Sequence, residues 1–517
     1  MALHLCRGRA GAFGVRAIIA SVALAVPLAY AGPGDISSCS NLSKLSISNT
    51  TITSSVYVPA AGTVPGYCEV NATVAPQTDI TVRMPDLWYQ RYIQLGGGGF
   101  DGNIPNLASP AMNFNKNPVA NGYAVAGSNG GHRSAAYPGA SFAVDRGLSL
   151  SYASGKIYDT DVVAKAAILA YYGKPAKYRY FAGCSNGGKN ASVAAAVFGD
   201  DYDGIVAGDG VYGHDDDDIG GSAMSGMTAK WAASVQATRA VPISAGKGAT
   251  VYQAQLAACD AADGIVDGII SNPEACHFNL LSLACSGTVS DTCLTAPEIQ
   301  TIASLRSDLT DTNGRVIGAP WGLGDPSQAN ASSTGLGGGF LALAFGVASY
   351  DINNFNLDRD FGTLKLVLDG VYGMSGGLPG ITNYLKKGKK LIIYHGWDDM
   401  TVQPYISPRF YSALQKSAGG DASNARLYMF PGMQHCRGGG GPDTADLVGA
   451  ITNWVEGGTP PNDSLVAAKL SATGAVTLTR PLCAYPKVPV YVGGDKSAAS
   501  SFACVAVNSA NSEQANQ

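Results

Sequence analysis

The chain carries little charge and contains no run of basic residues. Charged residues make up 14% of its 517 positions, and the formal net charge is −4. Proteins that bind nucleic acid usually present a basic patch or stripe. The composition therefore argues against nucleic acid as a partner. A hydrophobic fraction of 46% is typical of a globular chain, and the length allows a large core and more than one domain.

Long apolar runs are also missing beyond the N-terminal segment. Three arginines precede an apolar stretch that begins at Ala17, and Ala29-Tyr30-Ala31 has the small-x-small form of a cleavage site. The stretch is about 15 residues long, short of the ~20 that cross a bilayer. We expect residues 1–31 to be a signal peptide, with a retained anchor as the less favoured alternative. The mature protein is then secreted or periplasmic, with no membrane partner.

The cysteines do not follow a zinc-binding pattern, because no C-x-x-C pair has further Cys or His at zinc spacing. One cysteine falls within the expected signal peptide. The other ten, an even number in an exported chain, predict disulfides. They are Cys39, Cys68, Cys184, Cys259, Cys276, Cys285, Cys293, Cys436, Cys483 and Cys504. The sequence does not fix their connectivity, but three pairs would close short local loops: 259–276, 285–293 and 483–504.

Glycine, in contrast, is abundant, and several short apolar runs end in glycine-rich turns. The segment from Asp161 to Tyr172 lies between two of these runs and reads as a helix that stops at a glycine. Strands that alternate with helices, with polar residues after the strands, predict an α/β sheet that binds ligands at that edge. The runs cover residues 91–95, 123–126, 178–182, 391–394 and 427–430.

The strand–helix pattern fades in the middle of the chain, between about Gly210 and Lys387. This stretch is too long for a loop and holds four cysteines. We expect it to be a lid domain inserted between two strands of the core. The predicted organisation is an α/β core formed by residues 32–209 and 388–517, with the lid at 210–387.

A candidate nucleophile, Ser185, lies in the pattern Gly-x-Ser-x-Gly. An apolar strand that starts at Tyr178 precedes it, and an Ala-rich helix from Ala191 follows it. This strand–turn–helix context is the one in which a nucleophile elbow exposes its hydroxyl. An ordinary strand-to-helix turn is the alternative. The context favours the catalytic interpretation.

A catalytic serine of this kind needs a histidine base and an acid, in the chain order Ser, acid, His. His435 follows the strand at 427–430 and is the candidate base. His395 also follows a strand, but we expect it to pack the turn there. The other histidines of the mature chain lack a comparable turn after a strand. Asp398 and Asp399 both follow the strand at 391–394 and compete as the acid. The acid would fix the tautomer of the imidazole and stabilise the imidazolium.

The two candidate residues Ser185 and His435 each have a cysteine as a neighbour. Cys184 precedes the serine, and Cys436 follows the histidine. If these cysteines are bonded, their Cα atoms lie roughly 5.5 Å apart, which brings the nucleophile and the base together. Such a meeting is what nucleophilic catalysis requires.

An oxyanion hole of this fold combines the backbone N–H after the nucleophile with one from the loop after an early strand. Asn186 would supply the first. The glycine run at 96–99 follows the strand at 91–95, and glycine allows a close approach of backbone to substrate. We expect Gly98 or Gly99 to supply the second, with a plain turn as the alternative.

The expected lid contains three aspartates separated by glycines, Asp260, Asp263 and Asp267, with Cys276 downstream. Such a loop can wrap a hard cation, because calcium takes six to eight oxygens, including backbone carbonyls. The spacing is not that of an EF-hand, and a solvated acidic turn is an equal alternative on these residues alone.

Five motifs together resemble the tannase and feruloyl esterase family, whose members hydrolyse esters of aromatic acids such as ferulic, gallic and terephthalic acid. One departure is Lys189-Asn190 after the serine motif, where many members have Arg followed by Glu or Gln. The resemblance covers nearly the whole mature chain. The motifs lie at 183–188 (GCSNGG), 201–208 (DYDGIVAG), 259–268 (CDAADGIVDG), 395–399 (HGWDD) and 431–436 (PGMQHC).

The resemblance implies several assignments. It implies a disulfide between Cys184 and Cys436, and it selects Asp399 as the acid of the triad. It also implies a structural Ca²⁺ in the lid. Its ligands would be the side chains of Asp260, Asp263 and Asp267 and the carbonyls of Ile265 and Ile269.

We therefore expect a serine carboxylic-ester hydrolase with an α/β-hydrolase core and an inserted lid. It would act on small aromatic esters, as a monomer or a homodimer. Trp321, Phe340 and Phe345 are lid aromatics that would stack on an aromatic acid or pack the lid. One alternative is an esterase for aliphatic or polyester fragments. The other is a non-catalytic, calcium-binding secreted module with the same fold.

Overall fold

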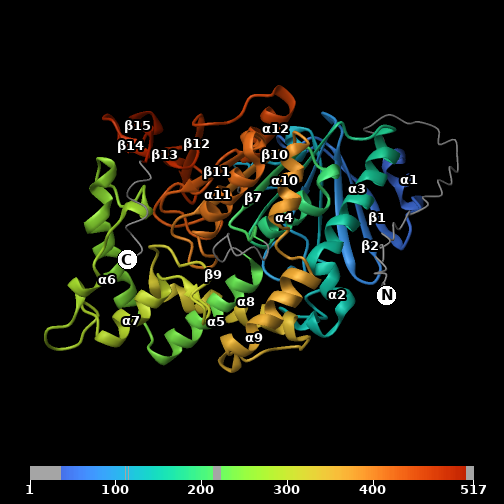
Figure 1. Ribbon diagram of the computed structural model, residues 1–517. Coiled ribbons are helices and arrows are strands. Elements are labelled where there is room, and N and C mark those ends of the chain that lie inside the picture. Colours follow the sequence, from blue (N-terminus) through green and yellow to red (C-terminus); the bar gives the residue numbers. More distant parts are fainter. Residues whose placement is uncertain (1–35, 111, 115, 214–222, 508–517) are drawn as a thin grey trace, which may run out of the picture.

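A nine-stranded mixed sheet forms the centre of the molecule (Figure 1). The computed structural model describes residues 36–110, 112–114, 116–213 and 223–507. The expected signal peptide at 1–31 lies outside these ranges. In sheet order the strands are β1 (Thr50–Val58), β2 (Tyr67–Val74), β3 (Thr78–Pro85), β5 (Tyr123–Ser128), β4 (Arg91–Leu95), β6 (Tyr178–Cys184), β7 (Gly204–Gly208), β10 (Lys390–Gly396) and β11 (Ala425–Phe430).

The sheet is antiparallel at one side and parallel at the other. Strands β1, β2, β3 and β5 pair antiparallel. From β5 to β11 all neighbours are parallel, so their carboxyl ends lie at one edge. All five strands expected from the sequence belong to this parallel part, which confirms the predicted α/β sheet.

Side chains alternate along the parallel strands between two apolar layers, as strand geometry requires. One face, with Ile93, Val206 and Ile392, packs on Trp454 of α12 (Leu447–Gly457). The other face packs on three helices, α3 (Lys156–Tyr172), α4 (Asn186–Val197) and α11 (Ile406–Ala418). Helix α3 contains the segment predicted as helical and ends at Gly173, which has a φ of 68°.

The segment between β7 and β10 contributes no strand to the large sheet in its described part. Its helices α5 and α8 pack together below the carboxyl edge of the sheet in Figure 1, while α10 packs on α4. Its elements are α5 (Met224–Ala240), α6 (Ala245–Cys259), α7 (Ala296–Leu305), β8 (Leu309–Thr310), β9 (Val316–Gly318), α8 (Ala329–Phe345), α9 (Leu357–Leu364) and α10 (Leu378–Lys386).

The remaining elements lie at the two ends of the chain. Two short helices, α1 (Ile36–Asn41) and α2 (Arg146–Leu150), precede α3. After α12 the chain forms two antiparallel hairpins, drawn in red in Figure 1. Their strands are β12 (Leu465–Leu470), β13 (Val476–Leu482), β14 (Lys487–Tyr491) and β15 (Phe502–Ala506).

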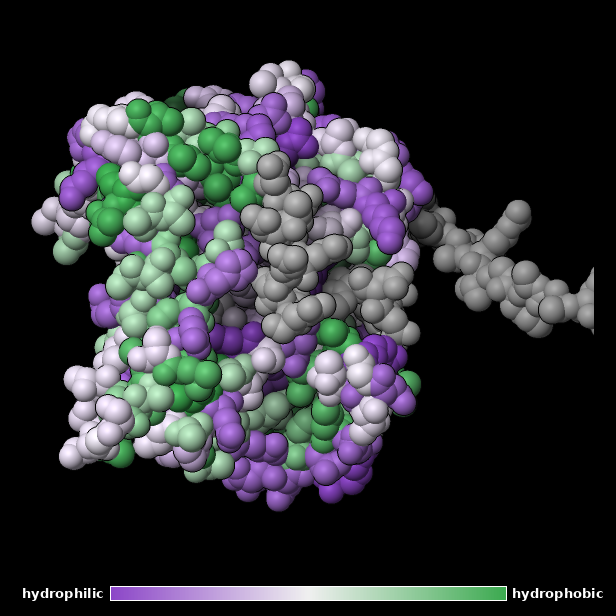
Figure 2. Space-filling view, turned by 60° about the vertical axis from the view of Figure 1, so that its left-hand side comes forward, coloured by the Kyte–Doolittle hydropathy of each residue, from purple (hydrophilic) through white to green (hydrophobic). Residues whose placement is uncertain are grey.

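Five disulfides join the ten cysteines of the described residues. They pair Cys39 with Cys68, Cys184 with Cys436, Cys259 with Cys276, Cys285 with Cys293, and Cys483 with Cys504. Disulfides of this number are typical of proteins that fold outside the reducing cytoplasm. Within the described ranges, every helix is too short or too polar to cross a bilayer. On the face shown in Figure 2, apolar residues form separate patches among polar ones.

Candidate active site

Ser185 lies at the sharp turn between β6 and α4. Its backbone has φ 63° and ψ −124°, a conformation that non-glycine residues rarely adopt. The turn packs so tightly that a Cβ at Gly188 would lie 2.0 Å from the carbonyl oxygen of Gly208. The glycines around the serine are therefore required by close backbone contacts. Strain of this kind is often found at functional sites.

His435 and Asp399 meet at the carboxyl edge of the sheet, after β11 and β10 respectively. Nδ1 of His435 lies 2.7 Å from Oδ2 of Asp399. Asp399 is fully buried, whereas the side chain of His435 is 21% exposed. The other oxygen of Asp399 accepts hydrogen bonds from the backbone N–H groups of Thr401 and Val402, which fix the orientation of the carboxylate.

The competing Asp398 has a different partner. Its Oδ2 accepts a hydrogen bond of 2.8 Å from the hydroxyl of Tyr252, on α6. Burial raises the pKa of Asp398 to about 6. The geometry thus pairs His435 with Asp399 and leaves Asp398 to tie the core to the inserted segment.

The electrostatics of the His435–Asp399 pair favour an ion pair. Burial by itself would raise the pKa of Asp399, but the charge of His435 and hydrogen bonds from His395 and His435 outweigh burial and lower that pKa. For His435, burial works to lower the pKa, but the charge and hydrogen bond of Asp399, with a further contribution from Asp209, raise it to about 9. The pair is therefore built to stabilise an imidazolium.

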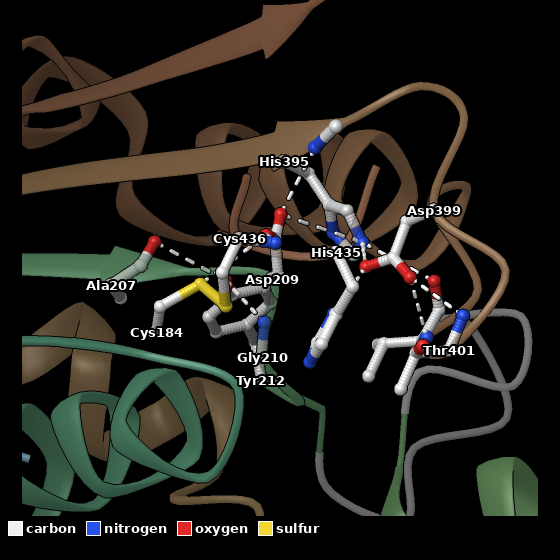
Figure 3. Close-up of a disulfide and its surroundings, with 12 residues drawn as sticks. Cys184, Ala207, Asp209, Gly210, Tyr212, His395, Asp399, Thr401, His435 and Cys436 are labelled. Atoms are coloured by element: carbon white, nitrogen blue, oxygen red, sulfur yellow. Dashed lines mark hydrogen bonds and ion pairs between the residues drawn. A yellow bond between two sulfur atoms is a disulfide. The ribbon is translucent and has the colours of Figure 1, made fainter. Parts of the chain in front are cut away.

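The disulfide between Cys184 and Cys436 lies beside these groups (Figure 3). Its Cα atoms are 6.0 Å apart, and its cysteines are separated by 252 residues of sequence. Since Cys184 and Ser185 are adjacent, as are His435 and Cys436, the bond brings the turn of the serine to the turn of the histidine.

Asp209 also lies in this centre, and sequence reasoning missed it. It follows β7 directly, is fully buried, and its Oδ2 lies 3.2 Å from Sγ of Cys184. Ligand atoms of Asp209, Asp399 and His435 all lie within 4.8 Å of one another. The sequence does contain a signal for Asp209, because it is an acid immediately after an apolar strand that ends in glycine. A polar residue after a strand is also what indicated Asp399 and His435.

His395 is fully buried behind the pair, as a residue that packs its turn would be. Its Nδ1 lies 2.7 Å from Oγ of Ser407, and its Nε2 lies 3.2 Å from Oδ2 of Asp399. His395 therefore contacts the same carboxylate oxygen of Asp399 as His435 does.

Asn186 and Gly99, two of the residues expected at the oxyanion hole, line the same cavity as Ser185. Gly98 is exposed, and Gly99 has a φ of 54°. The hydroxyl of Tyr152 lies 2.9 Å from the carbonyl oxygen of Gly99 and 3.1 Å from Oδ1 of Asn186. This tyrosine therefore ties the glycine loop to the start of α4.

A buried ion pair lies behind this loop. Nζ of Lys156 lies 3.0 Å from Oδ2 of Asp101, and both side chains are at most 3% exposed. The other oxygen of Asp101 accepts a hydrogen bond from Nδ2 of Asn186. Lys189, where the sequence departs from many family members, is buried as well, with its Nζ 4.3 Å from the centre of the Tyr152 ring.

The cavity at Ser185 is mostly apolar. Phe340 lines it, whereas Trp321 is buried in the core and donates to Oγ of Ser234, and Phe345 stacks on Tyr350. Other apolar lining comes from α5, α8 and the turn after β10. These residues are Met224, Met227, Trp231, Leu336 and Val402.

The three aspartates of the predicted calcium loop lie close to the C-terminal hairpins. Asp260 accepts hydrogen bonds from the backbone N–H groups of Asp267 and Gly268, and Asp267 forms an ion pair with Arg480. Burial and the neighbouring carboxylates raise the pKa of Asp263. Three carboxylates, one of them paired with Arg480, thus lie in one loop closed by the 259–276 disulfide. Carboxylate and carbonyl oxygens are the donors that a hard cation takes.

The chain is similar to known proteins along most of its length. The profile of the family described as tannase and feruloyl esterase matches residues 62–335 and 326–505. An uncharacterized esterase of Xanthomonas campestris pv. campestris is 33% identical over 90% of this chain and 91% of its own length. A probable feruloyl esterase of Arthroderma benhamiae is 30% identical, over 84% and 85% of the two chains.

A mono(2-hydroxyethyl) terephthalate hydrolase of Piscinibacter sakaiensis is 27% identical over 86% of each chain. The crystal structure of feruloyl esterase B from Aspergillus oryzae superposes with a TM-score of 0.76 at 22% identity, and covers 91% of this chain and all of its own. This match confirms the predicted α/β-hydrolase fold. The chain belongs to the tannase and feruloyl esterase family and is a carboxylic ester hydrolase.

Proposed function

We propose that this esterase hydrolyses esters of small aromatic acids through Ser185, His435 and Asp399. The observation that supports the proposal is the Cys184–Cys436 disulfide, which joins the strained turn of Ser185 to the turn of His435, the partner of Asp399. An apolar cavity lined by Trp231 and Phe340 opens beside the serine, and aromatic rings provide stacking surfaces for an aromatic acyl group.

In the proposed reaction, Nε2 of His435 accepts the proton of Ser185, and Oγ attacks the ester carbonyl. The backbone N–H groups of Asn186 and of Gly98 or Gly99 stabilise the oxyanion. The imidazolium then protonates the leaving alcohol, and an acyl-enzyme remains. Water attacks the acyl-enzyme with His435 again as base, and the acid leaves. Asp399 stabilises the imidazolium in both steps.

We also propose that the 260–269 loop holds a structural Ca²⁺. The side chains of Asp260, Asp263 and Asp267 and the carbonyls of Ile265 and Ile269 would be its ligands. The ion would neutralise the repelling carboxylates and takes no part in the reaction. An exported location, secreted or periplasmic, fits the five disulfides.

Substrate release assays test the acyl group. Methyl ferulate, methyl gallate and mono(2-hydroxyethyl) terephthalate should be hydrolysed with a higher kcat/KM than methyl butyrate. The aliphatic lining by Met224, Met227 and Val402 favours the alternative, an esterase for aliphatic or polyester fragments. Preference for methyl butyrate over all three aromatic esters would establish that alternative. A chain that hydrolyses none of them and resists fluorophosphonate labelling would be a non-catalytic module.

A further inference from the structure

Asp209 stands at the point where the three segments that carry the proposed triad come together. It is the residue after β7, and the preceding residue, Gly208, accepts a hydrogen bond of 2.9 Å from the backbone N–H of Ser185. The backbone N–H of Asp209 itself donates to the carbonyl oxygen of Tyr394 on β10, at 3.0 Å. The main chain here therefore links the serine turn to β10.

The carboxylate of Asp209 joins the other two segments. Oδ1 accepts a hydrogen bond of 3.0 Å from the backbone N–H of Gly396, where the turn that carries Asp399 begins. Oδ2 accepts a hydrogen bond from the backbone N–H of Cys436, next to His435. Figure 3 shows Asp209 between the disulfide and the His395–Asp399 pair. One buried side chain thus holds the turns of the acid and the base together.

The backbone around this side chain is held in unfavourable conformations. Asp209 has a φ of 41°, and Cys436, to which it is bonded, has a φ of 60°. Non-glycine residues at positive φ are uncommon, and they persist only where the surrounding structure fixes them. A hydrogen bond between two such residues is a specific constraint, not a consequence of regular secondary structure.

Asp209 also adds a second carboxylate near the imidazole of His435, because ligand atoms of the two residues lie within 4.8 Å of each other. Its Oδ1 lies 3.8 Å from Nε2 of a second imidazole, that of His395. Burial and the Asp399 carboxylate raise the pKa of Asp209, whereas the two histidines act to lower it. The titratable groups that face Asp209 come from its own segment, from β10 and its turn, and from the turn after β11. They are Tyr212, Tyr394, His395, Asp399 and His435.

We propose that Asp209 is a positioning residue of the ester-hydrolysis site, which fixes the place of His435 through the backbone of Cys436 and supports the imidazolium with its charge. The disulfide and Asp209 then hold the same turn in two ways, one covalent and one polar. This inference rests on the proposed function, because it assumes that His435 is the base for Ser185.

The test compares Asp209→Asn with Asp161→Asn as a matched control. Asp161 is also a buried aspartate, but it lies on α3 and pairs with Lys165. Asn keeps the size of the side chain but loses the charge, and its NH₂ group cannot accept a hydrogen bond from a backbone N–H. We expect kcat for methyl ferulate, or the best ester of the release assay, to fall about 100-fold with KM nearly unchanged, as for a misplacement of about 1 Å.

A pH profile separates positioning from a general loss of structure. Removal of the Asp209 charge lowers the pKa of His435, so the acid limb of kcat/KM should move to lower pH in Asp209→Asn. Asp209→Glu keeps the charge but displaces the carboxylate. It should lose at least tenfold in kcat with the acid limb in place, and it decides the matter if Asp209→Asn does not fold.

The outcomes distinguish this inference from the proposed function. If the Ser185→Ala variant keeps the activity of the unsubstituted enzyme, the proposed function itself is overturned. Suppose instead that activity depends on Ser185, but the kcat of Asp209→Asn or Asp209→Glu stays within threefold of the unsubstituted enzyme. That result would overturn the role of Asp209 alone. A loss of kcat in Asp209→Asn with an unmoved acid limb would also overturn it, since a merely structural residue behaves in that way.

Discussion

Cys184 and Cys436 are bonded to each other although 252 residues separate them, and each is the chain neighbour of a proposed catalytic residue. The bond closes a loop that contains β7, the inserted helices and β10. It therefore fixes the distance between the turns of Ser185 and His435 independently of the packing of the inserted segment.

Loss of this disulfide should affect catalysis more than stability. A crosslink over about 250 residues stabilises by up to ~5 kcal/mol in the chain-entropy model, and measured values often fall short of it. In Cys184→Ala/Cys436→Ala, kcat should fall even well below the melting temperature, where nearly all molecules are folded. Parental turnover under those conditions would show that the bond does not position the base. The Cys285→Ala/Cys293→Ala variant is the control for a disulfide outside the site.

The two aspartates after β10 should behave differently. Asp399→Asn should lower kcat by about 10⁴-fold, because the imidazole loses the partner that fixes its tautomer. Asp398→Asn removes a group that faces Tyr252 and should change kcat by less than about threefold. The kinetics of the two variants on one ester give the comparison directly. A large loss in Asp398→Asn and a small one in Asp399→Asn would reverse the assignment.

Activity should rise with pH into the alkaline range. The pKa of His435 is raised to about 9, so at lower pH the imidazole is protonated and cannot accept the proton of Ser185. The unprotonated fraction of His435 therefore limits kcat/KM below that pH. A profile of kcat/KM from pH 5 to 10 should show this limb. A plateau that already begins near pH 6 would contradict the strong interaction with Asp399.

Calcium should stabilise the protein without taking part in the reaction. A chelator should lower the melting temperature, and added Ca²⁺ should restore it, since a ligand bound only by the folded state stabilises that state. Asp263→Asn should weaken this response, whereas Asp291→Asn, at a surface position outside the loop, should leave it intact. An unchanged melting temperature, together with no calcium in elemental analysis, would refute the site.

The tyrosine beside the glycine loop should matter for turnover more than for substrate binding. Tyr152→Phe removes the hydroxyl that ties Gly99 to Asn186. We expect kcat to fall about tenfold with little change in KM, because an oxyanion donor acts in the transition state. Tyr123→Phe is a suitable control, since that buried hydroxyl contacts Thr452 on α12. Equal effects of the two substitutions would argue against a special role of Tyr152.

Much of the fold could be predicted because its signals are local. The strand before Ser185, the helix after it, and the glycines that the turn requires all lie within about 20 residues of one another. The same holds for the strands before Asp399 and His435. A strand followed by a polar turn is visible in the sequence, and the rule that parallel strands share an edge then brings the turns together.

The contacts that were not predicted join residues far apart in the chain. Asp209 reaches the backbone of Cys436, and Asp267 pairs with Arg480, 213 residues away. Neither contact can be recognised from the periodicity or the composition of the sequence. The buried pair of Asp101 and Lys156 is similar, because a lysine in a helix normally indicates a solvated face.

Labelling with a fluorophosphonate, located by mass spectrometry, tests the central claim most directly. The reagent needs an activated serine and an oxyanion hole but no particular acyl group. The account predicts one adduct per chain, on Ser185, with loss of ester hydrolysis in proportion to labelling. Ser185→Ala should take up no label, and His435→Ala should label far more slowly. An active enzyme that stays unlabelled, or one whose adduct lies on another residue, would contradict the account.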